Sequence, residues 1–115
     1  MAFNDLNETE QNVVRECLRA TVHGDFFPEW EFQTLFGLSR EQVEQVLESW
    51  PKINDSDESV ALSIINSLVN LLGYPYSDAD GKEWKKFISV PVTEVAKILT
   101  KWKGEKIENY LQGLQ

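Results

Sequence analysis

Cysteine and histidine are nearly absent from this sequence, which contains only Cys17 and His23. A single cysteine cannot form an internal disulfide, and residues 1–5 lack the basic start and apolar stretch of a secretory signal, so the sequence predicts a cytoplasmic protein. Zinc sites of the usual kind need several cysteines or histidines and are excluded. Cys17 and His23 are six positions apart on one expected helix, so their side chains would point in directions about 240° apart around it. They therefore cannot form a nucleophile–base pair. We expect Cys17 in the core, His23 at a helix end, and neither a metal nor a cofactor.

Long hydrophobic runs and clustered glycines are absent as well. The most apolar segment, Val60–Leu72, is interrupted by four polar residues and is too short to cross a bilayer. The six glycines stand singly, so no glycine-rich loop can hold a phosphate. The acidic segments that begin at Asp55 and Asp78 lack the glycine and glutamate that a calcium-binding EF-hand loop requires. The sequence therefore predicts no membrane span and no site for a phosphate or calcium ion.

Alternating β-strand patterns are missing, whereas apolar residues recur at helical spacing along most of the chain. Asn7 with Glu10, and Ser39 with Gln42, have the spacing of helix-capping boxes. A chain of 115 residues with 42% hydrophobic content can bury one core. We predict an all-α fold, a single compact domain of five to seven short helices. The expected helices cover residues 8–23, 28–36, 40–50, 60–72, 83–87 and 92–102, with 60–72 at the centre and a last turn near 107–111.

Two stretches of the chain resemble each other, which suggests an internal tandem repeat. The apolar residues of 39–50 recur 52 positions later in 91–102, as Val43/Val95, Val46/Ile98, Leu47/Leu99 and Trp50/Trp102. Weaker echoes upstream define possible units of residues 8–50 and 58–102, which would face each other across one core with pseudo-twofold symmetry. The alternative is that two amphipathic helices share this spacing by chance.

Basic residues are scarce in the first half of the chain. Residues 1–58 contain thirteen acidic residues and four basic ones, a net charge of −9, whereas residues 59–115 have a net charge of +1. A negative surface repels nucleic acid and attracts a cationic partner, chiefly by raising the rate of encounter. Acidity that only keeps the protein soluble is the alternative.

Aromatic and acidic residues lie close together in the segment Asp25–Glu31. Its three aromatic residues cannot easily all be buried beside three acids, so the segment is the best candidate for a protein interface. The acids of the following helix extend this surface. The predicted partner-binding residues are Asp25, Phe26, Phe27, Glu29, Trp30, Glu31, Glu41, Glu44 and Glu48. Trp30 and Trp84 are expected to be half exposed, and Trp50 and Trp102 to pack in the core.

The segment Phe32–Leu47 resembles the helix-turn-helix pattern of bacterial regulators, with a glycine in the turn, a serine cap and a pair of valines on the second helix. The resemblance covers sixteen residues and implies DNA binding by the second helix. Its expected exposed positions hold three carboxylates and one guanidinium, however, and such a surface repels phosphates. These positions are Arg40, Glu41, Gln42, Glu44, Gln45 and Glu48.

The sequence favours a small, acidic, non-enzymatic protein-binding module that engages a basic protein partner, with no nucleic acid and no membrane. The most specific form of this hypothesis is an inhibitor or immunity protein that covers the basic active site of a nuclease toxin. The alternative is a nucleic-acid-binding regulator that uses the helix-turn-helix-like segment and the lysines of the second half. These lysines are Lys82, Lys85, Lys86, Lys97, Lys101, Lys103 and Lys106. A hydrolase with paired carboxylates is a third class, and it predicts a deep pocket lined by acids with raised pKa values.

Overall fold

Helices form where the apolar periodicity predicts them. The computed structural model describes residues 2–24, 26–73 and 82–103. Its elements are η1 (Phe3–Asp5), a short 3-10 helix, followed by α1 (Glu8–His23), α2 (Glu29–Phe36), α3 (Arg40–Glu48), α4 (Glu58–Gly73), α5 (Lys82–Phe87) and α6 (Val92–Lys103). No strand occurs in the described residues, so the prediction of an all-α fold is confirmed. The predicted turn near residues 107–111 lies outside them.

Both predicted capping boxes are present. The backbone N–H of Glu10 donates to Asn7 Oδ1 over 2.7 Å, and the N–H of Asn7 donates back to Glu10 Oε1 over 2.9 Å. Ser39 and Gln42 form the same pair of hydrogen bonds at the start of α3. These bonds satisfy amide groups that have no partner inside the helix, which fixes where α1 and α3 begin.

Two glycines end helices for different reasons. Gly37 follows α2 in a left-handed conformation with φ of 69°, which a residue with a Cβ adopts only at a cost. Gly24 follows α1 with an ordinary negative φ, but a Cβ there would lie 2.6 Å from the Ala20 carbonyl oxygen and 2.8 Å from the Phe26 ring. Gly24 thus allows the chain to turn closely over the end of α1.

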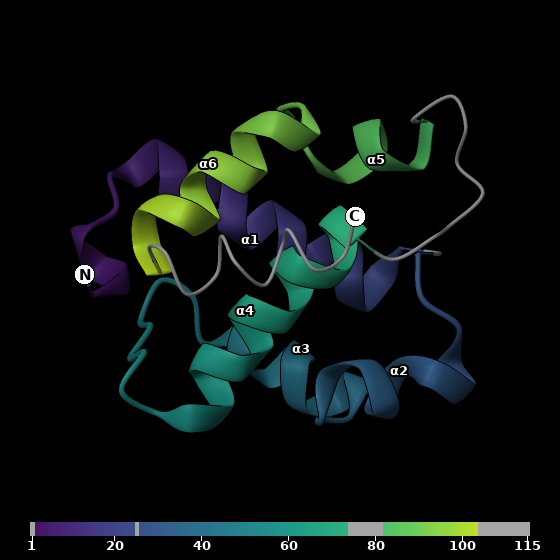
Figure 1. The fold of residues 1–115 in the computed structure, drawn as a ribbon. Coiled ribbons are helices and arrows are strands. Elements are labelled where there is room, and N and C mark those ends of the chain that lie inside the picture. The colour runs from purple at the N-terminus through teal and green to yellow at the C-terminus, as the bar shows by residue number, and fades with distance from the viewer. Residues whose placement is uncertain (1, 25, 74–81, 104–115) are drawn as a thin grey trace.

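The helices form one compact globule around α1 and α4 (Figure 1). These two helices pack against each other at the centre, with α5 and α6 on one side and α2 and α3 on the other. We predicted that the helix over residues 60–72 alone would be central, but α1 shares this position because seven of its side chains are buried. Within residues 2–24, 26–73 and 82–103, every helix falls short of the length and apolarity that a membrane span requires.

The two halves of the chain make equivalent contacts. The third helix of each half packs on the first helix of the same half, as α3 does on α1 and α6 on α4. The short second helix instead packs on the first helix of the other half, so α2 contacts α4 and α5 contacts α1. Each main contact therefore has a counterpart when α1–α3 are exchanged with α4–α6. This is the pattern that a pseudo-twofold arrangement would have, while duplication of the sequence stays a prediction.

Trp50 and Trp102, which correspond in the sequence comparison, meet on one ring. The Phe3 ring centroid lies 5.5 Å from that of Trp50 and 5.6 Å from that of Trp102, with both contacts edge-to-face. Edge-to-face pairs of this kind contribute about 0.5–1.5 kcal/mol beyond the burial of the rings. The segment before α1 therefore joins the ends of the two halves.

Candidate functional site

The segment between α1 and α2 divides its aromatic residues between the core and the surface. Phe26 and Phe27 are buried, whereas Trp30 is 80% exposed. The Phe27 ring packs edge-to-face against Phe36 of α2, with centroids 5.2 Å apart. The structure therefore leaves Trp30 as the one aromatic side chain of the predicted interface that a partner can contact in this conformation. Asp25 lies outside the described residues.

Arg40 fixes the start of α2 against the end of α1. Its Nη1 donates to the carbonyl oxygens of Thr21 and Val22 at 2.9 Å each, and its Nη2 donates to the Phe27 carbonyl at 3.1 Å. Its Nε donates to Glu29 Oε2 at 2.7 Å. The planar guanidinium is suited to several donors in fixed directions. Trp30, the next residue after Glu29, is thereby held on a fixed backbone.

Three glutamates form a stripe on the outer side of α3. Glu41 and Glu48 are exposed, and Glu44 is half-buried. At about 100° per residue, Glu48 lies within about 20° of Glu41 around the helix, and Glu44 within about 60°. None of the three forms a hydrogen bond or ion pair with another residue of the described chain. The carboxylates of the stripe are therefore not paired with any cation of the described residues.

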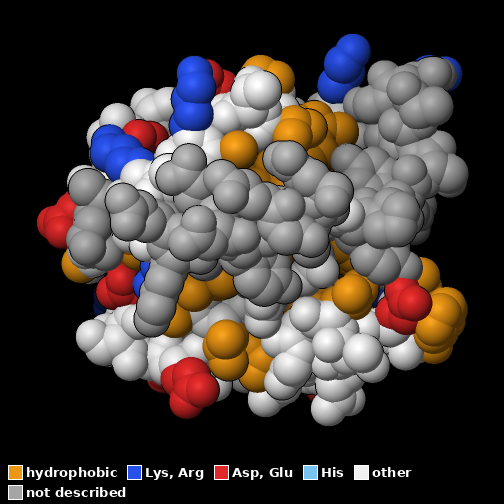
Figure 2. Space-filling view, viewed as in Figure 1, with side chains coloured by type: hydrophobic (Ala, Val, Ile, Leu, Met, Phe, Trp, Pro, Cys, Tyr) orange, Lys and Arg blue, Asp and Glu red, His pale blue; other side chains and the backbone are white. Residues whose placement is uncertain are grey.

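We use the name acidic surface for Glu29, Trp30, Glu41, Glu44 and Glu48. Glu29 belongs to it because its side chain is 77% exposed although it accepts from Arg40. Glu31, which we also predicted there, is half-buried and has an interaction of its own. In Figure 2, a protruding group of hydrophobic side chains lies beside acidic side chains at the lower right, over α2.

The lysines of the second half lie on other helices. Lys82, Lys85 and Lys86 belong to α5, and Lys97, Lys101 and Lys103 belong to α6. Figure 2 shows most of the basic side chains of this face along its upper edge, over α5 and α6. The main contacts of α3 are with α1 and α4. These lysines therefore do not flank the outer face of α3, where a helix-turn-helix protein would need phosphate contacts. Lys106 lies outside the described residues.

The residues suited to nucleophilic or metal chemistry lie apart from one another in the described structure. Cys17 is fully buried in α1, and burial raises the pKa of its thiol, so it is not a reactive thiolate. His23 lies in the last turn of α1, as predicted, and its side chain is exposed. Among the described residues, no three His, Cys, Asp or Glu side chains gather closely enough to hold a metal ion.

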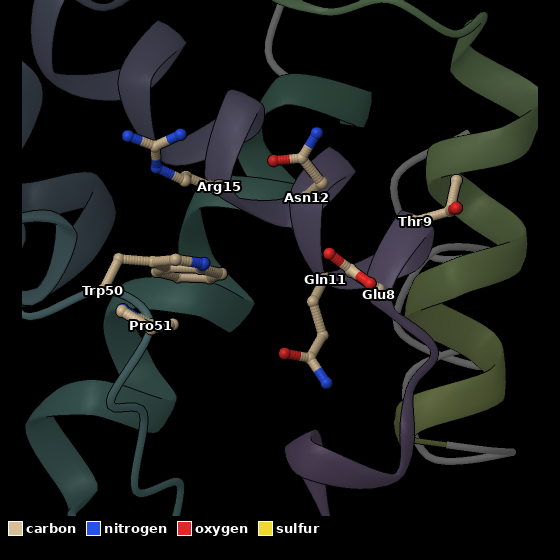
Figure 3. Close-up of a pocket in the computed structure, with 7 residues that line it drawn as sticks. All are labelled: Glu8, Thr9, Gln11, Asn12, Arg15, Trp50 and Pro51. Carbon is tan, nitrogen blue, oxygen red and sulfur yellow. The ribbon is translucent and has the colours of Figure 1, made fainter.

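An open groove lies between α1 and the turn that follows α3, and the sequence patterns did not reveal it. Its volume is about 460 Å³. Figure 3 shows the Trp50 ring extending from this turn towards α1, with Arg15 above it and with Gln11 and Glu8 beyond its free edge. We call this cavity the Trp50 groove. Its lining residues are Glu8, Thr9, Gln11, Asn12, Arg15, Trp50 and Pro51.

A smaller cavity of about 240 Å³ lies between α1 and α6. Its charged residues pair with one another, since Lys101 Nζ lies 2.8 Å from Glu10 Oε1 and Lys97 Nζ lies 3.3 Å from Glu94 Oε1. The bond from Lys101, together with the backbone N–H that Glu10 accepts, lowers the pKa of Glu10. A hydrolase with paired carboxylates needs a raised pKa, so this cavity gives that hypothesis no support.

No protein-family model, curated protein or solved structure matches the chain.

Proposed function

We propose that the chain is a protein-binding module whose acidic surface engages a basic protein partner. The exposure of Trp30 is the observation that carries the proposal. An indole that stays in water forgoes about 1.5–3 kcal/mol or more of burial free energy, and exposed tryptophans at a partner surface are frequent hot spots. A large exposed aromatic side chain next to the exposed carboxylate of Glu29 therefore suits an interface in which the ring is the anchor.

The charges of the acidic surface support a cationic partner. Glu41, Glu44 and Glu48 form no ion pair with another described residue, because the neighbouring Arg40 is occupied by three carbonyl groups and Glu29. The net charge of the chain is −8, so its long-range field adds to the local one. An anionic partner such as DNA would lose binding energy on this surface, because few cations are present to displace its counterions.

The sharper proposal is an inhibitor or immunity protein for a nuclease. Nuclease active sites bind phosphates with clustered cations, and a row of carboxylates has the same sign of charge as those phosphates. The capping box of α3 and the contacts of Arg40 fix the backbone that carries this row before binding, which lowers the entropy cost of association.

A paired comparison tests the proposal. Tagged wild-type protein is used to capture partners from native lysate at low salt, beside the variant Glu41→Gln/Glu44→Gln/Glu48→Gln. A control variant, Glu8→Gln/Glu58→Gln/Glu94→Gln, has the same change in net charge at other exposed positions. We expect a basic protein to bind the wild type and the control, to be lost from the α3 variant, and to elute as salt is added.

The outcomes separate the hypotheses. Equal capture by the α3 variant and the wild type would remove the acidic surface from the proposal. If the captured protein is a nuclease, adding the wild-type chain should inhibit its activity in proportion to binding, and Trp30→Ala should weaken that inhibition at least tenfold. Capture of nucleic acid in place of protein would support the helix-turn-helix alternative.

A further inference from the structure

The Trp50 groove combines an aromatic platform with polar groups that have no partner in the described chain. Trp50 is half-buried, and its edge-to-face contact with Phe3 at 5.5 Å holds the ring in place. Pro51 is exposed beside it. The volume of about 460 Å³ falls within the range of small-molecule sites and is too small for a folded domain.

The polar groups of the groove come from one side of α1. Glu8, Asn12 and Arg15 follow one another at intervals of four and three residues, so their side chains line one side of the helix over about 10 Å. All three are exposed, and none forms a hydrogen bond or ion pair with another described residue. Gln11 is different, since its Nε2 donates to the Leu6 carbonyl at 2.7 Å. That bond leaves the Gln11 side-chain oxygen oriented and able to accept.

The groove therefore sets four requirements for its ligand. An acceptor-only carboxylate at Glu8 and a donor-only guanidinium at Arg15 need a ligand that both donates and accepts along its length. Their charges cancel, so an ion of either sign would meet a like charge at one end. An apolar ligand would leave Asn12 and Arg15 without hydrogen bonds after losing water. A ring with an apolar face would still be needed to cover Trp50.

A neutral sugar meets all four requirements. Its hydroxyl groups both donate and accept, it has no net charge, and the C–H groups on one face of its ring pack on an indole while the hydroxyl groups point outward. A disaccharide also matches the length from Glu8 to Arg15. We propose that the Trp50 groove binds a neutral saccharide of one or two rings, with Trp50 under the sugar ring and with Asn12, Arg15 and the Gln11 oxygen on its hydroxyl groups.

This site is separate from the acidic surface. The outer stripe of α3 is centred on Glu41 and Glu48, whereas Trp50 continues the opposite, inward side that includes the buried Val43 and Val46. Saccharide binding thus neither requires nor excludes a basic protein partner, and each proposal can fail without the other.

Nuclear magnetic resonance of the ¹⁵N-labelled full chain tests the proposal. Glucose, N-acetylglucosamine, maltose and cellobiose are titrated to millimolar concentrations, with glucuronate and a neutral pentapeptide as comparison ligands. We expect at least one neutral sugar to shift the indole N–H signal of Trp50 and the side-chain amide signals of Asn12 and Gln11 in a saturable way. The Trp30 indole signal should not move.

Variants on the exposed side of α1 give the second arm. Asn12→Ala and Arg15→Ala change exposed side chains that form no hydrogen bond or ion pair with another described residue, so the protein should stay folded while sugar affinity falls at least about fivefold, as expected for loss of one hydrogen bond. Arg19→Ala, an exposed arginine on α1 outside the groove, is the matched control and should bind as the wild type does. The proposal is overturned if no neutral sugar gives a saturable shift, if glucuronate or the peptide binds more tightly, or if Asn12→Ala and Arg15→Ala bind sugar unchanged.

Discussion

The indole N–H of Trp102 donates to Asp55 Oδ2 over 3.2 Å, and this bond ties the end of α6 to the connector between α3 and α4. The same oxygen accepts the backbone N–H of Phe3 at 2.9 Å. One carboxylate oxygen therefore holds together the first segment of the chain, the central connector and the last described helix. Its two donors are 47 and 52 residues away in sequence.

Removing this carboxylate should destabilise the fold. Asp55→Ala leaves the Trp102 indole N–H and the Phe3 amide without their acceptor, and we expect the free energy of unfolding to fall by about 1–3 kcal/mol. Urea denaturation followed by tryptophan fluorescence measures the change. Ser56→Ala, at the next position and exposed, should change stability by less than about 0.5 kcal/mol. If the two variants were equally stable, Asp55 would have no anchoring role.

Arg40 offers a test of geometry at constant charge. In Arg40→Lys one ammonium replaces a guanidinium that donates to three carbonyl groups and Glu29, so we expect a loss of about 1–3 kcal/mol in the free energy of unfolding. Arg19→Lys on the exposed side of α1 is the matched control and should stay within about 0.5 kcal/mol of wild type. Equal stability of Arg40→Lys and Arg19→Lys would show that charge alone matters at position 40.

The ion pair of Glu10 and Lys101 should make stability depend on pH. The hydrogen bond from Lys101 lowers the pKa of Glu10 below its ordinary value of 4.5, so the folded state favours the ionised carboxylate. The resulting stabilisation is complete above about pH 4.5 and is lost as the pH falls through the lowered folded pKa. We therefore expect Lys101→Met to lower the thermal midpoint by roughly 1–4 °C at pH 7 and to have a progressively smaller effect as the pH falls below 4.5.

Lys85→Met is the control for this pair. Lys85 is exposed on α5 and has no ion pair with another described residue, yet its replacement changes the net charge by the same amount. Thermal unfolding from pH 3 to pH 7 should show a pH-dependent difference for Lys101→Met alone. The same pH profile in both variants would assign the effect to overall charge.

The glutamates of α3 should matter little for folding. Glu41, Glu44 and Glu48 make no ion pair in the described chain, so the triple change to lysine should leave the thermal midpoint within a few degrees while weakening partner capture. Circular dichroism during heating measures the first effect. A drop of more than about 10 °C would mean that the stripe has a structural role, since exposed charges contribute little to stability.

Local signals predicted the start and end of helices well. The cap at Asn7 depends on a partner three residues away, as does the cap at Ser39, and Gly37 ends α2 because of its own backbone conformation. Interactions of this range are visible in the sequence because the partners are neighbours in the chain. The all-α fold followed from the same short-range periodicity.

Burial of individual aromatic residues could not be predicted in this way. We expected Trp84 to be half exposed, and this was wrong, because it is buried and its indole N–H donates to the Val90 carbonyl at 2.8 Å. In the segment before α2, we predicted Phe26, Phe27 and Trp30 as partner-binding residues, whereas Phe26 and Phe27 are buried and Trp30 is exposed. The answer depends on rings from later elements, since Phe26 packs on Phe87 of α5 with centroids 6.5 Å apart and Phe27 packs on Phe36 of α2.

The candidate surfaces differ in how far the sequence reveals them. The stripe of Glu41, Glu44 and Glu48 follows from helical spacing, which a single element determines. The Trp50 groove joins α1 to a turn 35 residues after Arg15, and only tertiary packing brings them together. The one available signal was the polar spacing of Glu8, Asn12 and Arg15, which is also the spacing of any solvated helix face.

Because α2 packs on α4 and α5 packs on α1, neither half of the chain can complete its core alone. A break in the exposed connector at Asn54 would thus yield two fragments that remain largely unstructured apart and recover the native helices when mixed. Such reassembly would show that the two halves stabilise each other as the subunits of a dimer do, because each fragment folds only in contact with the other.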